Sequence, residues 1–254
     1  MRALEIELVP CLSDNYAYLV HDAEAGLTAV VDPSEAPPVV KALAARDWKL
    51  THILNTHHHF DHTGGNIPLK AEFGAEIVGP GKDRARFAGI DTGVDEASGW
   101  RFGARPVRVM EIPAHTSSHI AFIVDDAVFT GDTMFAMGCG RLFEGTPAMM
   151  WSSLSKLMTL PDSTRVFCGH EYTQSNGRFA LTMEPNNVAL AARMKDVDAA
   201  RAKGTPTIPS TIGLEKQTNP FCRPASAELR KTLGMEKASD VDVLGETRRR
   251  KDNF

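Results

Sequence analysis

Short apolar runs, separated by turn-forming residues, recur along the first two thirds of the chain. Residues 4–9 alternate apolar and acidic side chains, which is the pattern of a strand with one buried face. The pair Asp125-Asp126, between two later runs, indicates a hairpin turn. The runs predict strands at residues 4–9, 16–20, 27–31, 48–55, 77–78, 107–112, 120–124, 127–130 and 165–168.

Helical patterns interrupt these strands and replace them towards the C-terminus. Apolar positions at helical spacing predict helices at residues 37–46, 149–160, 175–184, 187–203, 226–233 and 240–251. The stretch at residues 63–73 begins with paired glycines and then becomes helix-like, ending before Gly74. We expect a proline-punctuated loop at residues 205–224, whereas the glycine-rich stretch at residues 79–103 supports no assignment. The pattern therefore predicts a mixed α/β domain at residues 1–173 and a helical domain at residues 174–254.

The composition is that of an ordinary globular protein, with 43% hydrophobic and 24% charged residues among 254. The formal net charge of −4 does not favour nucleic acid as a partner, and no apolar run approaches the roughly 20 residues that span a bilayer. Acidic residues interrupt the apolar N-terminal stretch, unlike a secretory signal. The four cysteines lack C-x-x-C spacing, so reduced thiols are expected. We therefore expect a cytoplasmic monomer without a membrane or nucleic-acid partner.

The stretch T-H-H-H-F-D-H-T-G-G-N, at residues 56–66, places four histidines and one aspartate directly after an apolar run. Imidazole and carboxylate groups are the nitrogen and oxygen ligands that borderline divalent metals prefer. In an extended segment His57 and His59 share a face, whereas His58 points away. Asp61 and His62 follow after one spacer, where a turn can direct them at a second position. The sequence therefore predicts a two-metal site.

Three more strands end in a small or turn-forming residue followed by a side chain that can bind a metal. These side chains are His115, Asp132 and His170. Strand ends at one edge of a sheet converge in space, so these residues can meet although they lie far apart in sequence. Together with residues 57–62 they supply five histidines and two aspartates, which is enough for two metals with open positions.

These motifs together resemble the metallo-β-lactamase superfamily, and within it the hydroxyacylglutathione hydrolases (glyoxalase II). The resemblance extends over nearly the whole chain and implies an αββα sandwich with the site at one edge of its two sheets, followed by a small C-terminal helical domain. The matching motifs are T-H-H-H-F-D-H-T-G-G-N, L-S-D-N-Y-A-Y-L, G-D-T-M-F, G-C-G-R-L-F-E-G-T, G-H-E-Y-T, N-P-F and the ending R-R-R-K-D-N-F.

The resemblance implies two divalent metal ions per chain, with zinc favoured over iron or manganese. One ion would be bound by His57, His59 and His115, and the other by Asp61, His62 and His170, with Asp132 bridging them. A hydroxide bridging the two metals would attack a thioester carbonyl. Asp61 and Asp132 would also be catalytic, because their carboxylates would orient this hydroxide.

The resemblance also implies the substrate, a glutathione thioester. Hydrolysis of S-(2-hydroxyacyl)glutathione, chiefly S-D-lactoylglutathione to D-lactate and glutathione, is the second step of methylglyoxal detoxification. Cationic and hydroxyl groups would bind the glutathione carboxylates. Taken alone, R-R-R-K would be interpreted as a solvated basic helix end. The substrate-binding residues implied are Arg141, Phe143, Tyr172, Arg248 and Lys251.

The chain departs from the family pattern at three positions. The family often has Lys where Arg141 stands and Tyr where Phe143 stands, and it usually has Gly where Ala114 stands. None of these positions is an expected metal ligand. The departures therefore leave the chemistry intact and bear on substrate affinity.

The alternative reading is a glutathione persulfide dioxygenase, which shares this fold and uses a single iron held by two histidines and an aspartate. Such enzymes usually lack the long helical tail and the G-H-E-Y-T stretch. The metal count per chain and oxygen consumption on glutathione persulfide would distinguish the two. A metal-binding protein without catalysis would be expected to have lost ligands, and none is lost here.

Overall fold

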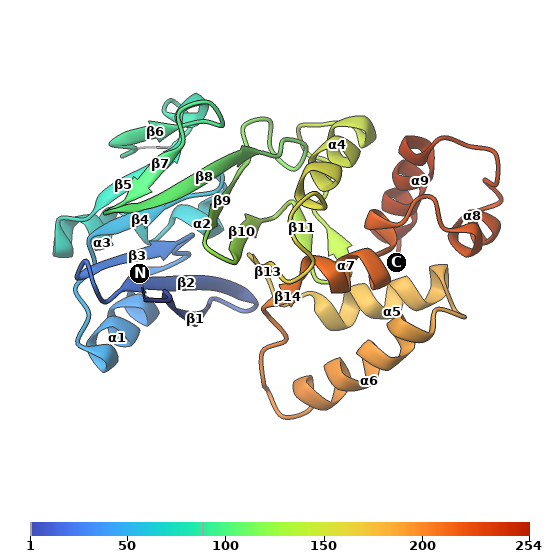
Figure 1. The fold of residues 1–254 in the computed structure, drawn as a ribbon, viewed down its shortest axis with the longest axis horizontal. Coiled ribbons are helices and arrows are strands. Elements are labelled where there is room, and N and C mark those ends of the chain that lie inside the picture. The colour runs from blue at the N-terminus through green and yellow to red at the C-terminus, as the bar shows by residue number, and fades with distance from the viewer. Residues whose placement is uncertain (1, 88) are drawn as a thin grey trace. The chain divides into compact units, whose positions relative to one another are not determined.

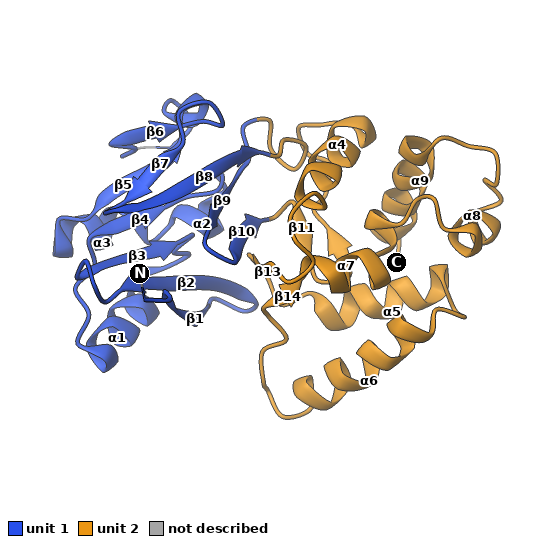
Figure 2. Ribbon diagram, in the orientation of Figure 1, with its two compact units in different colours: residues 1–111, 118–131 blue, residues 112–117, 132–254 orange. Residues whose placement is uncertain are grey.

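The computed structural model describes residues 2–87 and 89–254, which divide into two compact units (Figure 2). Unit 1 comprises Met1–Glu111 and Ser118–Gly131, and unit 2 comprises Ile112–Ser117 and Asp132–Phe254. Strands and helices are mixed in unit 1, and helices dominate the C-terminal part of unit 2. The predicted mixed α/β class with a helical C-terminal region is confirmed. Within the described ranges, no helix has the length and apolar character needed to cross a membrane.

The first sheet of unit 1 has six strands, in the order β1-β2-β3-β4-β5-β6. The first three strands pair antiparallel, whereas β3 to β6 pair parallel. Parallel pairing requires crossover segments, and α1 (Ala36–Arg46) and α3 (Asn66–Phe73) lie in two of them. The strands are β1 (Glu5–Cys11), β2 (Asn15–Asp22), β3 (Leu27–Val31), β4 (His52–Leu54), β5 (Glu76–Pro80) and β6 (Thr92–Val94).

Alternate residues of β2 divide between two buried faces. Leu19 belongs to a core cluster that also contains Leu43 of α1 and Leu69 of α3, so these helices cover one face of the first sheet (Figure 1). Tyr18 points to the other face, where its ring centroid lies 5.7 Å from that of Phe129 in the second sheet. This period of two is the one expected of a strand buried on both sides.

The second sheet of unit 1 consists of antiparallel neighbours in the order β7-β8-β9-β10. The Asp125-Asp126 turn joins the last two, as predicted, and Asp125 has a left-handed φ of 50°. These strands are β7 (Trp100–Phe102), β8 (Arg105–Glu111), β9 (Ile120–Val124) and β10 (Ala127–Gly131). The unassigned stretch at residues 79–103 contains β6, β7 and a short 3-10 helix, η1 (Gly81–Asp83).

Unit 2 contains short paired strands and six helices among its described residues. The side chains of Thr146, Asn187, Thr211, Ser226 and Ser239 each cap a helix start by accepting a hydrogen bond from a backbone N–H. The elements are β11 (Met134–Phe135), β12 (Gly138–Cys139), α4 (Pro147–Leu157), β13 (Arg165–Cys168), α5 (Thr173–Met183), α6 (Val188–Arg201), β14 (Ser210–Thr211), α7 (Ile212–Thr218), α8 (Ala227–Leu233) and α9 (Asp240–Asp252).

One predicted element is wrong. The expected loop at residues 205–224 contains β14, α7 and the 3-10 helix η2 (Pro220–Cys222). The helix expected after the paired glycines of residues 63–73 is α3, which ends before Gly74 as predicted, whereas the short helix α2 (Phe60–Thr63) before Gly64 and Gly65 was not expected. A Cβ at Gly64 would lie 2.4 Å from the Ser34 carbonyl oxygen, so the chain turns here where only glycine allows the close approach.

Candidate active site

In unit 1, the segment after β4 brings the histidines of the metal motif together. His57 is fully buried, and its ring centroid lies 4.8 Å from that of His59 and 4.2 Å from that of His62. Because α2 begins at Phe60, Asp61 and His62 lie in its first turn, with Asp61 Oδ2 3.6 Å from His62 Nε2. The strand end and the short helix therefore place these side chains in one group.

Asp32, which directly follows β3, fixes the segment after β4 through hydrogen bonds to its side-chain carboxylate. Its carboxylate accepts hydrogen bonds from the Thr56 backbone N–H (2.8 Å) and the Thr56 hydroxyl (2.6 Å). Its Oδ2 also lies 3.2 Å from His62 Nδ1. A carboxylate only accepts, so Nδ1 of His62 donates and Nε2 is left to face Asp61.

His58 does not join the group, as the alternation along the segment predicted. Its Nδ1 lies 3.4 Å from Oδ2 of Asp83, a fully buried carboxylate that also accepts a hydrogen bond from the Ser118 hydroxyl. The second histidine of T-H-H-H therefore faces Asp83 and does not belong to the group of His57, His59 and His62.

In unit 2, Asp132 lies beside both of the other predicted histidines. Its Oδ2 is 3.5 Å from His115 Nε2 and 3.3 Å from His170 Nε2, and all three residues are buried. The Arg141 carbonyl oxygen accepts from His115 Nδ1 at 3.0 Å, which directs Nε2 towards Asp132. A Cβ at Gly140 would lie 2.0 Å from the Asp132 carbonyl oxygen, so this packing requires glycine.

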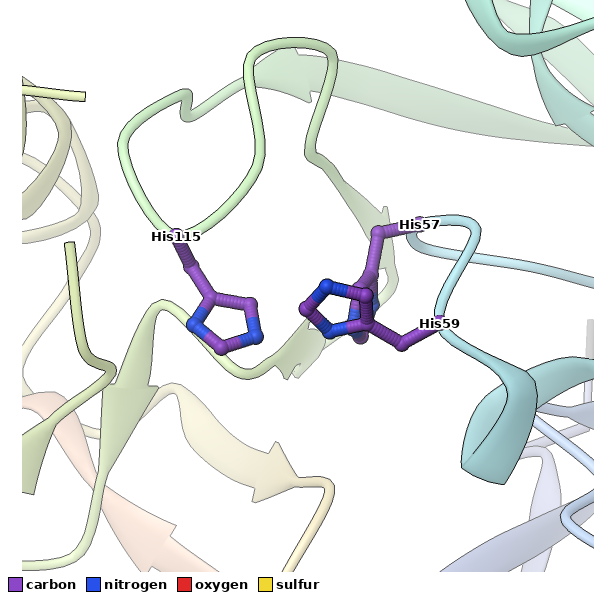
Figure 3. Close-up of side chains that lie close together, drawn as sticks. All are labelled: His57, His59 and His115. Atoms are coloured by element: carbon purple, nitrogen blue, oxygen red, sulfur yellow. The ribbon is translucent and has the colours of Figure 1, made fainter. Parts of the chain in front are cut away.

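The residues that could hold an ion form groups whose ligand atoms lie within 4.8 Å of one another. One group is His57, His59 and His115, which are drawn as sticks in Figure 3. A second is Asp61, His62 and His170, and a third is Asp32, His57 and His62. Metal–ligand bonds of about 2.0–2.2 Å keep the ligand atoms of one ion within roughly 4 Å of one another. This set of imidazole and carboxylate donors fits divalent ions.

The first two groups contain the residues that the resemblance assigned to the two ions, and their roles as ligands stay predictions. Asp32 was missed by sequence reasoning, which looked only at the later strand ends. A signal was present, because the apolar run V-V before Asp32 ends in a metal-capable side chain in the same way as the other strands. Its bonds to Thr56 indicate an anchor for the segment rather than an outward-facing ligand.

A cluster of cations lies in unit 2, on α9 and in the segment after β12. Arg248 is buried, donates from Nη1 to the Cys139 carbonyl oxygen (2.7 Å) and pairs with Asp252 (3.0 Å). Arg141 lies 3.7 Å from the same Asp252 carboxylate. Burial, and then the charges of Arg248 and Arg141, lower the pKa of Lys251. One carboxylate does not neutralise this cluster, which therefore favours an anion.

Two aromatic residues expected to bind substrate lie beside the unit 2 histidines. The Tyr172 ring stacks on His170, with centroids 4.6 Å apart, and Phe143 lies 5.2 Å from His115. Phe143 is 62% exposed, so its ring is available to a ligand. The structure thus brings Tyr172 and Phe143 next to His170 and His115. It also places Arg141 and Arg248 on Asp252, with Lys251 close enough for their charges, in addition to burial, to lower its pKa.

The four cysteines are free and buried, in agreement with the expectation of reduced thiols. Burial raises the pKa of Cys11 and Cys139 to about 11 and that of Cys168 to about 12. Because the thiolate is the nucleophilic form, none of these three thiols is suited to nucleophilic catalysis near neutral pH.

Comparison with known proteins identifies the family. The metallo-beta-lactamase superfamily model matches residues 13–170, and the model for the hydroxyacylglutathione hydrolase C-terminus matches residues 171–254. A hydroxyacylglutathione hydrolase from Methylococcus capsulatus is 52% identical over 253 residues, which is 99% of each chain. The chain has the metallo-β-lactamase fold and is a member of that superfamily of metal-dependent proteins. Within the superfamily, it belongs to the hydroxyacylglutathione hydrolase family.

Solved structures share the fold. The BLEG-1 B3 metallo-beta-lactamase aligns with a TM-score of 0.67 at 19% identity, covering 86% of this chain and 99% of that one. The protein TTHA1623, crystallised in a di-iron-bound form, aligns with a TM-score of 0.58 at 26% identity and covers 85% of this chain and 99% of its own. The fold expected from the motifs is therefore confirmed.

Proposed function

We propose that this chain hydrolyses S-(2-hydroxyacyl)glutathione thioesters, chiefly S-D-lactoylglutathione to D-lactate and glutathione. The relatives that carry the name hydroxyacylglutathione hydrolase support this activity. The choice of a glutathione thioester as substrate rests on the cluster of Arg141, Arg248 and Lys251. This cluster is a binding site for an anion in the same unit as Asp132 and His170. Glutathione brings two carboxylates, which such cations bind through charge-assisted hydrogen bonds.

Two divalent ions would be held by the donor groups described above. His57, His59 and His115 would hold one, and Asp61, His62 and His170 the other, with Asp132 bridging. Zinc is favoured, with iron or manganese as alternatives, since all three suit imidazole and carboxylate donors. Bound divalent ions supply Lewis acidity, which lowers the pKa of water and polarises a carbonyl oxygen.

The side chains of the site position the reactants. The carboxylates of Asp61 and Asp132 accept hydrogen bonds from water and so orient it towards the thioester carbonyl carbon. The leaving group is the glutathione thiolate, and because a thiol has a pKa near 8.5 it departs without a strong acid from the chain. The buried cysteines take no part.

The C-terminal region, residues 174–254, supplies most of the recognition of glutathione. Lys251 and Arg248 attract its carboxylates, and Arg141 adds a planar fork where a lysine would offer a point charge. Tyr172, stacked on His170, offers a hydroxyl group, whereas Phe143 offers only an apolar surface. The residues that bind the glutathione part of the substrate are therefore different from the metal-site residues that act on the thioester bond.

The test combines metal analysis with a hydrolysis assay. Metal-replete protein is expected to contain two ions per chain and to release glutathione from S-D-lactoylglutathione, measured as free thiol. A protein that leaves this thioester intact but acts on another class of substrate would overturn the proposal. One iron per chain together with oxygen consumption on glutathione persulfide would establish the dioxygenase instead.

A further inference from the structure

The amide of Asn15 reaches one residue of the metal motif from a distant part of unit 1. Asn15 opens β2, is only 4% exposed, and its Nδ2 donates to both the main-chain oxygen (3.0 Å) and Oδ2 (3.1 Å) of Asp61. An amide nitrogen carries two hydrogens, so both bonds form at once. The side chain thereby fixes the backbone and the carboxylate of one residue together.

Asp61 is a ligand candidate that needs such support. Its side chain is 42% exposed, whereas His62 is buried and held through Nδ1 by Asp32. It also lies in a helix of only four residues, which by itself gives a side chain little rigidity. The oxygen that Asn15 holds is Oδ2, which is also the oxygen 3.6 Å from His62 Nε2.

Asn15 itself is rigidly placed. It pairs with Cys11 at the end of the β1–β2 hairpin, and the turn before it contains Leu12 in a left-handed conformation with φ of 48°. The Leu12 N–H donates to the Glu35 carboxylate at 2.8 Å, which ties the turn to the start of α1. The amide is therefore set by the hairpin and not by the metal motif.

We propose that Asn15 is a positioning residue that orients Asp61 towards the second ion, an inference that rests on the proposed two-metal centre. A neutral amide N–H donor does not compete for the ion, yet it prevents the carboxylate from turning into solvent. Groups that orient a ligand typically contribute 10–100-fold to metal affinity. The effect falls on the ion bound by Asp61 and leaves the ion at His57 and His59 unchanged. The motif L-S-D-N-Y thereby gains a function in the metal site.

The experiment measures the affinity of each ion in variants that lack the donor. Metal-free wild type, Asn15→Ala and the near-isosteric Asn15→Leu are titrated with Zn²⁺, and the stoichiometry and both dissociation constants are recorded. We expect the variants to bind one ion as wild type does and the other 10–100-fold more weakly. Asn15→Ser, which keeps a shorter donor, is expected to recover part of the affinity.

Thr28→Val is the control, because Thr28 is a buried polar residue of the same unit that bonds to His21 and Thr51 and lies outside the metal motif. It is expected to keep both affinities, and thermal unfolding of each metal-free variant verifies that it folds. Unchanged affinities in Asn15→Leu, or an equal weakening of both ions, would overturn the positioning role while thioester hydrolysis by wild type still stood. Wild-type protein that binds a single ion would overturn the two-metal centre and this inference together.

Discussion

Ala114 is a residue whose backbone conformation glycine would adopt more readily. It directly precedes His115, has a φ of 153° and is fully buried. Gly145 packs against it so closely that a Cβ there would lie 2.4 Å from Ala114 Cα. An alanine in this region stores strain of about 1–3 kcal/mol. The strain therefore lies at the residue directly before His115, a predicted metal ligand.

Ala114→Gly is therefore expected to raise the free energy of unfolding by about 1 kcal/mol. Relief of strain exceeds the roughly 0.4–1 kcal/mol by which glycine stabilises the unfolded chain. Denaturant unfolding of metal-free protein measures the change. The control is Ala121→Gly, a buried alanine within β9, which is expected to lower stability by about 0.5–1 kcal/mol or more. Equal losses in both variants would contradict strain at Ala114.

Lys251 offers the cleanest test of the anion cluster. Its Nζ bonds to the Ser175 hydroxyl at 3.1 Å and lies over the rings of Phe179 and Phe254. Lys251→Gln removes the charge, so we expect KM for the glutathione thioester to rise several-fold while kcat changes less. Steady-state kinetics measure both, with Lys82→Gln in unit 1 as the control. An equal fall in kcat and kcat/KM would contradict a binding role.

The lowered pKa of Lys251 adds a pH dependence to this prediction. The ammonium is lost at a lower pH than for an ordinary lysine, because burial, Arg248 and Arg141 all disfavour the charge. KM of wild type is expected to rise as the pH increases through that pKa, and Lys251→Gln is expected to lack this part of the rise. Profiles of KM against pH for the two proteins provide the measurement.

The sequence predicts the main ligand groups because their chemistry is local. Spacing alone places His57 and His59 on one side of the extended segment and His58 on the other. The positions of His115 and Asp132 at strand ends indicate that they belong to the same site. The residues that hold these groups are not predictable in this way. Asn15 is joined to Asp61 across 46 positions, a relation that only the folded hairpin creates.

At the scale of elements, apolar runs predicted the strands well, but the same criterion missed helix α7. β3, β9 and β13 have the bounds expected from their runs, because each is buried along nearly its whole length. Helix α7 was missed because one of its buried positions is Glu215. Glu215 accepts from the Met137 backbone N–H at 2.8 Å and pairs with Arg193 at 2.7 Å. A buried carboxylate breaks the apolar periodicity on which the prediction depends.

His52, the first residue of β4, is expected to make unit 1 sensitive to acid. Its ring lies edge-on to Trp100 and Phe102, and burial lowers its pKa although Glu76 opposes the shift. The unfolded chain therefore binds a proton at His52 at a higher pH than the folded chain does. This contribution to stability is present above the unfolded pKa of about 6.5 and is lost as the pH falls below it.

His52→Gln removes this titration. The free energy of unfolding of metal-free wild type is expected to fall more steeply between about pH 7 and pH 5 than that of the variant. Denaturant titrations at several pH values measure the two slopes, and metal-free protein avoids the effect of acid on ligand binding. Parallel slopes would show that another group governs acid sensitivity in this range.

At the scale of the whole molecule, the change of pattern near residue 174 predicted two domains, and that boundary stays a prediction. Within unit 2, residues on both sides of it share one core: Met137 packs with Ala180, Leu190 and Met194. Asn219 also donates to the Gly138 carbonyl oxygen at 2.9 Å. Local periodicity detects where strands give way to helices, but it does not detect which helices complete the packing of an earlier hairpin.

A chain ending at residue 173 tests this coupling. It keeps β11 and β12 but loses the side chains of Ala180, Leu190 and Asn219 that bury Met137 and bond to the hairpin. We therefore expect hydrogen exchange in residues 132–173 of the fragment to be much faster than in the full chain, while residues 5–80 of unit 1 keep more protection. Because Asp132 and His170 lie in the exposed segment, the fragment is also expected to bind fewer metal ions. A fragment that unfolds cooperatively, with protection across residues 132–170 equal to that of the full chain, would instead favour the boundary at residue 173 and assign the tail to substrate binding alone.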